Sequence, residues 1–170
     1  MYNYYSNGTS GQHTANNPPQ YHKPPSSQPV QSPTIKTDFG PNPFVVDIAK
    51  ATLNNDTYRT ALWTGKHLQL TVMSIPVGGD IGLEMHPNVD QFLRIEEGQG
   101  LTQMGNSREN LYLQQPVFDD FAIFIPAGTW HNVTNTGNEP LKLYSIYAPP
   151  NHPFGTIHQT KAIAELEEGH

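Results

Sequence analysis

The chain of 170 residues (18.9 kDa) has the length of one domain with at most an appendage. Lys and Arg number 9 against 15 Asp and Glu, so the formal net charge is −6, which excludes a general electrostatic attraction to nucleic acid or anionic lipid. Cysteine is absent, so any metal ion must be held by His, carboxylate, amide or water.

The N-terminal residues carry neither a basic start nor the apolar core of about 7–15 residues that marks a signal peptide. No stretch approaches the ~20 apolar residues of a membrane span. We therefore expect a cytoplasmic protein whose partners include neither a membrane nor nucleic acid.

Residues 1–43 differ in composition from the rest of the chain. They hold eight of the 16 prolines and are otherwise rich in Asn, Gln, Ser, Gly and Tyr, with almost no aliphatic side chains. Such a segment cannot bury enough apolar surface to offset the entropy lost on ordering. We predict a disordered tail over residues 1–43 and one folded domain over residues 44–170, in which 7 basic and 14 acidic side chains give a net charge of −7.

The folded region begins with a short predicted helix over residues 47–53. Short runs of β-branched and aromatic residues follow, separated by turns that contain Gly, Pro or Asn, a pattern typical of an all-β sandwich or barrel. The predicted strands cover residues 58–63, 68–75, 81–86, 91–97, 100–104, 110–114, 121–125, 131–135 and 141–148. Because the connections are short, we expect mostly antiparallel pairing. A terminal helix is predicted over residues 160–168, with Ala162, Ile163 and Leu166 on one side.

The first segment that carries ligating side chains runs over residues 82–98. Residues two apart on a strand share a face, so Glu84 and His86 project together. They offer a carboxylate and an imidazole to one cation.

Alternation also selects the next side chain that points inward. If Gln91 faces the interior, Leu93 and Ile95 do so as well, whereas an inward Asp90 would bury Arg94. We therefore predict that Gln91 faces the interior beside Glu84 and His86, and that Arg94 points away from it.

The second segment runs over residues 126–135 and places His131 just after a tight turn. Pro126 fixes φ at the start of this turn, and Gly128 tolerates the left-handed region. The turn is expected to aim His131 into the same interior space.

The two segments resemble the two motifs of the cupin superfamily. The second cupin motif, Pro-x-Gly, two residues, His, three residues, Asn, is matched at Pro126, Gly128, His131 and Asn135, with Asp120 at the position of its leading glycine. The first motif, His-x-His, three or four residues, Glu, six residues, Gly, is matched in spacing. Its first histidine is replaced by Glu84 and its glutamate by Gln91, and the motif ends at Gly98.

The resemblance implies a double-stranded β-helix, or jelly roll, with ligands at its mouth. Glu84, His86 and His131 then form a set of two histidines and one carboxylate, with Gln91 as a weak fourth ligand or a hydrogen-bonding neighbour. Such a set suits Fe(II), and also Zn, Mn or Ni. The alternative is that these polar groups satisfy one another without a metal ion.

An apolar row is predicted on the other face of the strand over residues 81–86. It consists of Ile81, Leu83 and Met85, which a second subunit or the segment around Phe44 would cover. Cupins commonly dimerise through such faces, so the resemblance implies a homodimer.

Two histidines follow the last predicted strand, His152 and His158, which flank Pro153 and Gly155. A C-terminal segment that crosses the mouth of the barrel would bring one of them near the substrate. The alternative is an ordinary surface loop.

Three functions remain open. The first is an enzyme for a small polar substrate, similar to the mannose-6-phosphate isomerase-like or germin-like cupins, in which the metal acts as a Lewis acid in isomerase or epimerase chemistry and Glu84 or a bound hydroxide relays the proton. The second is an Fe(II)-dependent dioxygenase, and the third is a non-enzymatic protein of storage, sensing or surface assembly. A phosphorylated substrate is not expected, because no cluster of Arg or Lys is recognisable near the site.

Overall fold

The computed structural model describes residues 37–168, so residues 1–36 of the predicted tail lie outside the described residues. The elements, in chain order, are α1 (Ile48–Leu53), β1 (Arg59–Thr64), β2 (Gln69–Ile75), β3 (Asp90–Glu97), β4 (Gly100–Gly105), β5 (Leu113–Val117), β6 (Ala122–Ile125), β7 (Trp130–Asn135), β8 (Leu141–Ala148), β9 (Ile157–His158) and α2 (Lys161–Glu168). The predicted all-β class is confirmed.

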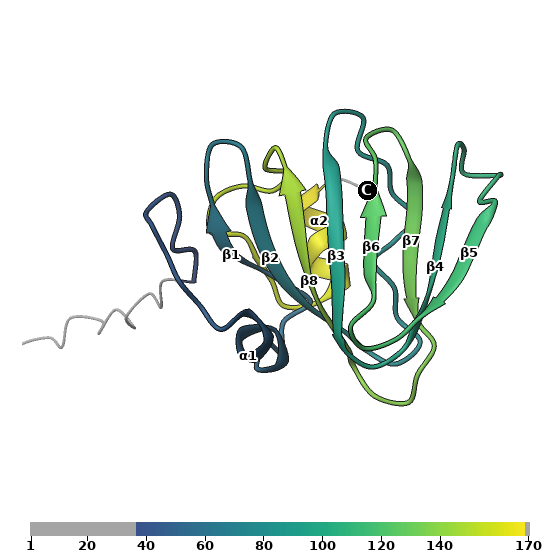
Figure 1. The fold of residues 1–170 in the computed structure, drawn as a ribbon, viewed down its shortest axis with the longest axis horizontal. Helices are drawn as coiled ribbons and strands as arrows, with labels where there is room; N and C mark the ends of the chain where they lie inside the picture. Colours follow the sequence, from purple (N-terminus) through teal and green to yellow (C-terminus); the bar gives the residue numbers. More distant parts are fainter. Residues whose placement is uncertain (1–36, 169–170) are drawn as a thin grey trace, which may run out of the picture. The chain divides into compact units, whose positions relative to one another are not determined.

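The strands form two antiparallel sheets (Figure 1). One sheet has the order β6-β3-β8-β2-β1-β9 and the other has the order β5-β4-β7. Only the pairs β1–β2 and β4–β5 join strands that follow one another along the chain. The remaining pairs join distant strands, as in a jelly roll, which confirms the predicted double-stranded β-helix.

The core lies between the two sheets, and along β3 and β7 buried side chains alternate with more exposed ones. On β3, Gln91, Leu93 and Ile95 are buried, with exposed fractions of 4%, 0% and 0%. Their neighbour Arg94 points outward and forms an ion pair with Asp120. The predicted register of this strand is confirmed.

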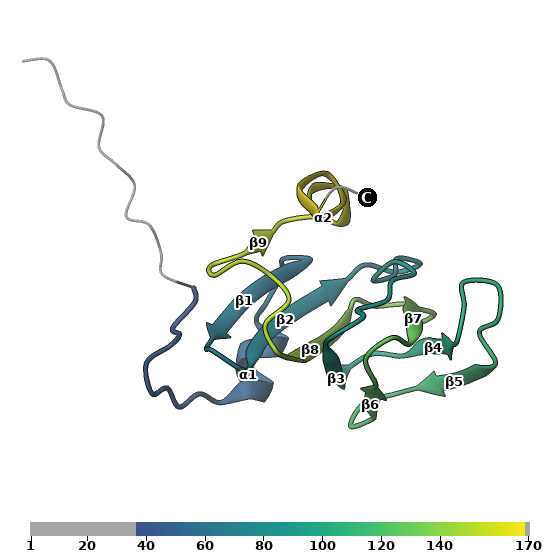
Figure 2. The ribbon, with the colours of Figure 1, turned by 90° about the horizontal axis from the view of Figure 1, so that it is seen from above.

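The two helices lie on opposite sides of the six-stranded sheet (Figure 2). Helix α1 begins after Asp47, whose side chain accepts a hydrogen bond from the Lys50 N–H (3.0 Å) as an N-terminal cap. Helix α2 occurs where it was predicted, but its buried residue is Ala164, and Leu166 is 83% exposed. The helix meets the barrel through a small side chain because charged pairs occupy the rest of this contact.

Residues 37–43, the end of the predicted tail, pack beside β1. Asp38 is 2% exposed, and its carboxylate accepts hydrogen bonds from the backbone N–H groups of Gly40, Thr64 and Gly155 at 3.0, 2.9 and 3.0 Å. Ordered structure therefore starts before residue 44. Composition could not reveal this, because individual contacts hold the segment: the buried Asp38 carboxylate and hydrogen bonds from the Phe39 N–H to Leu62 and from the Trp63 ring to the Asn42 carbonyl.

Two predicted strands require correction. Residues 81–86 do not form a strand: only isolated bridges, at Asp80 and Glu84, join this region to β7, and Gly82 interrupts it at a φ of +87°. The strand predicted over residues 110–114 lies three residues later as β5, because the chain first makes a turn that Asn110 closes on Ser107 and Asn106.

The interruption at Gly82 also removes the predicted apolar row. Ile81 is 5% exposed and belongs to the hydrophobic core, whereas Leu83 and Met85 line a cavity. The apolar row was the observation from which the homodimer was predicted, so this surface no longer supports that prediction. Among the described residues, no helix has both the length and the apolar character needed to cross a membrane.

Candidate metal centre

The segment over residues 80–86 is held in place by polar contacts rather than by a strand ladder. The Tyr58 hydroxyl donates to the carbonyl of Ile81 (3.0 Å), and the Gly82 N–H donates to the Asp80 carboxylate (2.9 Å). Two backbone hydrogen bonds then fix Glu84 opposite His131 on β7. These contacts carry Glu84 and His86 to the mouth of the barrel.

The turn before β7 connects the two motif segments directly. Gly128 has a φ of +79°, and its N–H donates to the carbonyl of His86 (2.8 Å). The orientation of the His131 ring is also fixed, because its Nδ1 lies 2.9 Å from the carbonyl oxygen of Thr129. A carbonyl can only accept, so Nδ1 carries the proton and Nε2 is the nitrogen left to bind a metal.

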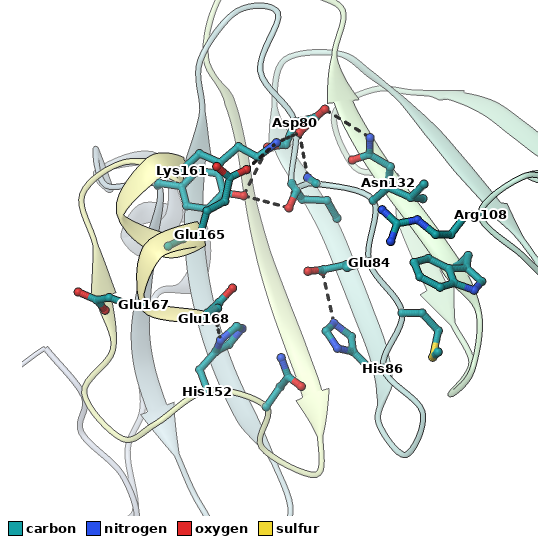
Figure 3. A pocket seen from close by; sticks show the side chains of 18 of the residues that line it. Asp80, Glu84, His86, Arg108, Asn132, His152, Lys161, Glu165, Glu167 and Glu168 are labelled. Carbon is teal, nitrogen blue, oxygen red and sulfur yellow. Dashed lines mark hydrogen bonds and ion pairs between the residues drawn. The ribbon is translucent and has the colours of Figure 1, made fainter. Parts of the chain in front are cut away.

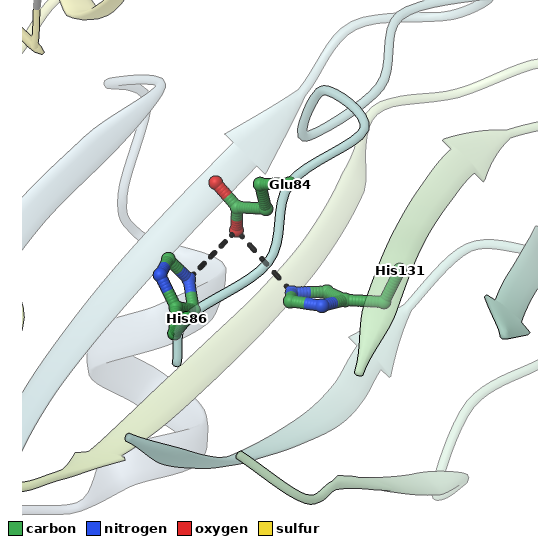
Figure 4. A group of neighbouring side chains, drawn as sticks. All are labelled: Glu84, His86 and His131. Carbon is green, nitrogen blue, oxygen red and sulfur yellow. Dashed lines mark hydrogen bonds and ion pairs between the residues drawn. The ribbon is translucent and has the colours of Figure 1, made fainter. Parts of the chain in front are cut away.

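Three predicted ligands converge (Figure 4). One ligand atom from each of Glu84, His86 and His131 lies within 4.8 Å of the other two. Glu84 Oε1 is 3.3 Å from His86 Nε2 and 3.4 Å from His131 Nε2. Three of the four side chains predicted to meet at one point therefore lie together, and metal binding by them stays a prediction.

The electrostatics of this cluster fit a divalent cation. Burial by itself raises the pKa of Glu84, but the closeness of His131 and His86 to its carboxylate outweighs burial and holds the pKa well below its usual range. Nε2 of the fully buried His131 has no hydrogen-bond partner among the described residues. An ionised carboxylate and an unpartnered imidazole nitrogen facing one point are the donors that a metal ion of this class requires.

Gln91, the predicted fourth ligand, has a different set of contacts. Its amide nitrogen donates to the Ser145 hydroxyl (3.0 Å), and its buried amide oxygen has no hydrogen-bond partner among the described residues. Direct ligation by Gln91 stays a prediction.

The cluster of Glu84, His86 and His131 lies at the wall of a cavity of about 890 Å³ (Figure 3). Glu84 and His86 face this cavity, whereas His131 is buried behind them. The segment over residues 80–86 forms one side, β7 and the β4–β5 loop form another, and α2 with the segment after β8 closes the third. Several lining residues were not predicted from the sequence as part of a site, among them Asp80, Arg108, Asn132, Lys161 and Glu168.

The C-terminal segment does cross the mouth of the barrel, which favours the first of the two alternatives for His152. His152 lines the cavity, and its Nδ1 lies 2.9 Å from Glu168 Oε1 on α2. The same carboxylate oxygen accepts a hydrogen bond from the buried guanidinium of Arg59 (2.8 Å). His158 is buried behind this group, 3.2 Å from Glu167.

The other motif positions have structural roles. The Asn135 amide donates to the carbonyls of Ile75 (2.9 Å) and Glu139 (2.8 Å), and so joins β7 to two neighbouring segments. Asp120 has a φ of +68°, the left-handed conformation that the glycine of the cupin motif adopts at low cost. The residue at the glycine position of the motif is therefore in a backbone conformation that favours glycine.

Comparison with known proteins agrees with this architecture. A family model described as "Cupin domain" matches residues 71–147. The uncharacterized protein YrkC of Bacillus subtilis is 68% identical over 131 residues, which cover 77% of this chain and 70% of YrkC.

Solved structures show the same fold. BH2720 from Bacillus halodurans is 68% identical, with a TM-score of 0.76 over 76% of this chain and 98% of that one. TT1209 from Thermus thermophilus has a TM-score of 0.53 at 19% identity, over 62% of this chain and 96% of that one. The chain belongs to the cupin superfamily, in the family that also contains YrkC.

Proposed function

We propose that this cupin is a cytoplasmic enzyme that uses a divalent metal ion to act on a small polar molecule. The observation that carries the proposal is the convergence of Glu84, His86 and His131, within 4.8 Å of one another, at a cavity of about 890 Å³. A cavity of this size accommodates a small metabolite.

The three side chains have different roles in this proposal. His86 and His131 would hold the ion together with Glu84, and the bound ion would supply Lewis-acid polarisation of a carbonyl or enediol oxygen. Glu84 faces the cavity, and its carboxylate has two oxygens. While one oxygen contacts the ion, the second is available to take a proton from the substrate and return it. His131 is kept in a single tautomer by Thr129, which orients its ligating nitrogen before any ion binds.

This chemistry is that of isomerases and epimerases, in line with the resemblance to mannose-6-phosphate isomerase-like cupins. The donor set itself also favours a second reaction class, since two histidines and one carboxylate with open positions suit Fe(II) and oxygenase chemistry. The identity of the ion therefore decides between the two.

The deciding experiment is elemental analysis of the full chain purified without added metal, followed by spectra under anaerobic and aerobic conditions. Zinc or manganese in stoichiometric amount supports Lewis-acid chemistry, and iron that oxidises in air supports the dioxygenase. If neither the purified protein nor the protein incubated with these ions holds a stoichiometric metal, the proposed function is wrong.

An assembly role would depend on the N-terminal segment rather than on the cavity. Deletion of residues 1–36 leaves every described contact of Asp38 in place. An enzyme keeps its metal and turnover in this variant, whereas a storage or surface-assembly protein loses incorporation into its assembly.

A further inference from the structure

The carboxylates that line the cavity are all paired. Asp80 and Glu165 contact the amino group of Lys161, Glu84 contacts the two histidines, Glu167 contacts His158, and Glu168 contacts His152 and Arg59. Each carboxylate of the cavity walls therefore already contacts a basic or imidazole group of the protein.

Arg108 is the exception among the charged residues of this cavity. Of the two Lys and Arg side chains that line it, Lys161 is bound by Asp80 and Glu165, whereas Arg108 has no carboxylate within ion-pair distance among the described residues. Figure 3 shows its guanidinium pointing into the cavity, on the side of Glu84 and Asn132. Arg108 is thus the basic side chain of this lining that has no carboxylate partner among the described residues.

A cation–π contact supports this guanidinium. Its Cζ lies over the Trp130 ring, 4.9 Å from the ring centre. A cation–π contact does not use the N–H groups of the guanidinium as hydrogen-bond donors to a carboxylate, so they can still donate to an anion. Trp130 directly precedes the ligand His131 on β7, so the charge is tied to the strand that carries the metal site.

The loop that carries Arg108 is also constrained. The Asn110 N–H donates to the Ser107 carbonyl (3.2 Å), and the Asn110 amide donates to the Asn106 side chain (2.9 Å). Gly105, before the loop, approaches the Asn110 carbonyl so closely that an added Cβ would lie 1.8 Å from it. The loop is therefore a tight turn that presents Arg108 from a fixed base.

We infer that Arg108 binds the anionic group of the substrate, so that the substrate is a small molecule with a carboxylate or phosphate at one end and metal-binding oxygens at the other. The metal-binding end rests on the proposed function, whereas the anionic end rests on the charges and contacts of Arg108. A guanidinium matches the two oxygens of a carboxylate or phosphate with paired, charge-assisted hydrogen bonds.

Three small molecules test the anionic end and the metal-binding end of the inferred substrate separately in one experiment. Glycerol, glycerate and glycerol 3-phosphate all offer vicinal hydroxyl oxygens, but only the last two carry an anion, a carboxylate in one and a phosphate in the other. We expect at least one of the two anions to bind the full chain about tenfold or more tightly than glycerol, as measured by calorimetry. Which anion binds more tightly identifies the group that Arg108 accepts.

The variant Arg108→Gln removes the charge, and Arg108→Lys keeps a positive charge without the paired N–H donors of the planar guanidinium. Arg108→Gln should weaken binding of the preferred anion about tenfold and leave glycerol binding unchanged, whereas Arg108→Lys should restore part of the affinity. The matched control is Arg94→Gln, since Arg94 lies on the outer surface in an ion pair with Asp120. The control should leave all three affinities unchanged.

Metal content, measured on the same samples, keeps the two proposals apart. A wild-type protein that holds no stoichiometric metal, either as purified or after incubation with the ions, refutes the proposed function but leaves the comparison of anion with glycerol intact. The role of Arg108 is refuted if neither anion binds at millimolar concentration, if glycerol binds as tightly as the anions, or if Arg108→Gln binds the preferred anion like the wild type.

Discussion

Glu84 and His131 contact each other through both their backbones and their side chains. The Glu84 N–H donates to the His131 carbonyl (3.0 Å), the His131 N–H donates to the Glu84 carbonyl (2.9 Å), and Glu84 Oε1 lies 3.4 Å from His131 Nε2. Directly opposed residues of an antiparallel pair point to the same face. The distance between these two ligands is therefore set by the backbone, before any ion binds.

The first prediction concerns His131. His131→Ala should abolish metal uptake, because it removes one of three converging donors while the backbone pair with Glu84 persists. The measurement is elemental analysis, with circular dichroism as the check on folding. Because loss of a buried ring also lowers stability, Glu84→Gln, which preserves the side-chain volume, provides a second test.

The control for both variants is His67→Ala, since His67 is exposed and is not part of the cluster. A stoichiometric ion in folded His131→Ala protein would show that His131 is not a ligand.

The second prediction separates the two roles left open for Gln91. Its amide already donates to Ser145, so we expect a neighbour that supports the site rather than a ligand. Gln91→Ala should then weaken metal binding by less than ~1–2 kcal/mol, the usual contribution of one hydrogen bond. The affinity is measured by competition with a chelator, with the exposed Gln114→Ala as control. Complete loss of metal in the first variant would identify Gln91 as a direct ligand.

The sequence predicted the candidate ligand residues more accurately than it predicted the backbone structure of the segment that contains them. Glu84 and His86 meet as a strand would place them, yet the segment is not a strand, because Gly82 and the contacts of Tyr58 and Asp80 break its pairing. The spacing of the motif survives this interruption because Gly82 precedes both ligands. The predicted apolar row is not formed, because Ile81 precedes Gly82 and its side chain turns into the core.

The walls of the cavity could not be derived from the sequence. Arg108 lies in a loop between two strands, and α2 is more than 70 residues away from Glu84 along the chain. No periodicity or motif connects these segments; what joins them is contact between elements of different sheets. The absence of a local cluster of Arg and Lys was therefore a poor guide to the charge of the cavity, which is assembled from distant single residues.

The third prediction concerns the ion pairs beneath α2. Arg59 has a side chain that is 2% exposed, and Glu168 Oε1 lies 2.8 Å from it. Glu168→Gln should destabilise the protein by about 2 kcal/mol, less than for a fully buried pair because a quarter of the Glu168 side chain is exposed. Glu165→Gln on the same helix, whose carboxylate is half exposed, should cost less than ~1 kcal/mol. Denaturant unfolding of both variants measures the difference, and equal effects would contradict the structural role of Glu168.

The same contacts predict a dependence of stability on pH. Burial raises the pKa of Glu168, but hydrogen bonding to His152 and the charge of Arg59 outweigh it, so its pKa in the folded protein is lowered. Burial of His152 lowers its pKa as well. A group with a lowered pKa stabilises the fold above its unfolded pKa and loses this contribution as the pH falls. The free energy of unfolding should therefore decrease from neutral pH into the range below 4.5 where unfolded Glu titrates, and Glu168→Gln should flatten this decrease; an unchanged slope would contradict the assignment.

The fourth prediction is the homodimer, which now depends on a different surface. Strand β6 ends the six-stranded sheet and presents Phe124, 68% exposed, whose ring stacks edge-on against Phe92 at 5.2 Å. An exposed sheet edge with aromatic side chains is typically covered by a partner. We expect the full chain to sediment as a dimer at micromolar concentration and Phe124→Ser to shift it towards the monomer. Leu166→Ser, which removes an apolar side chain from α2 that is even more exposed (83%), should leave the dimer intact. A wild-type monomer would refute the dimer, and a dimer unaffected by Phe124→Ser would place its interface elsewhere.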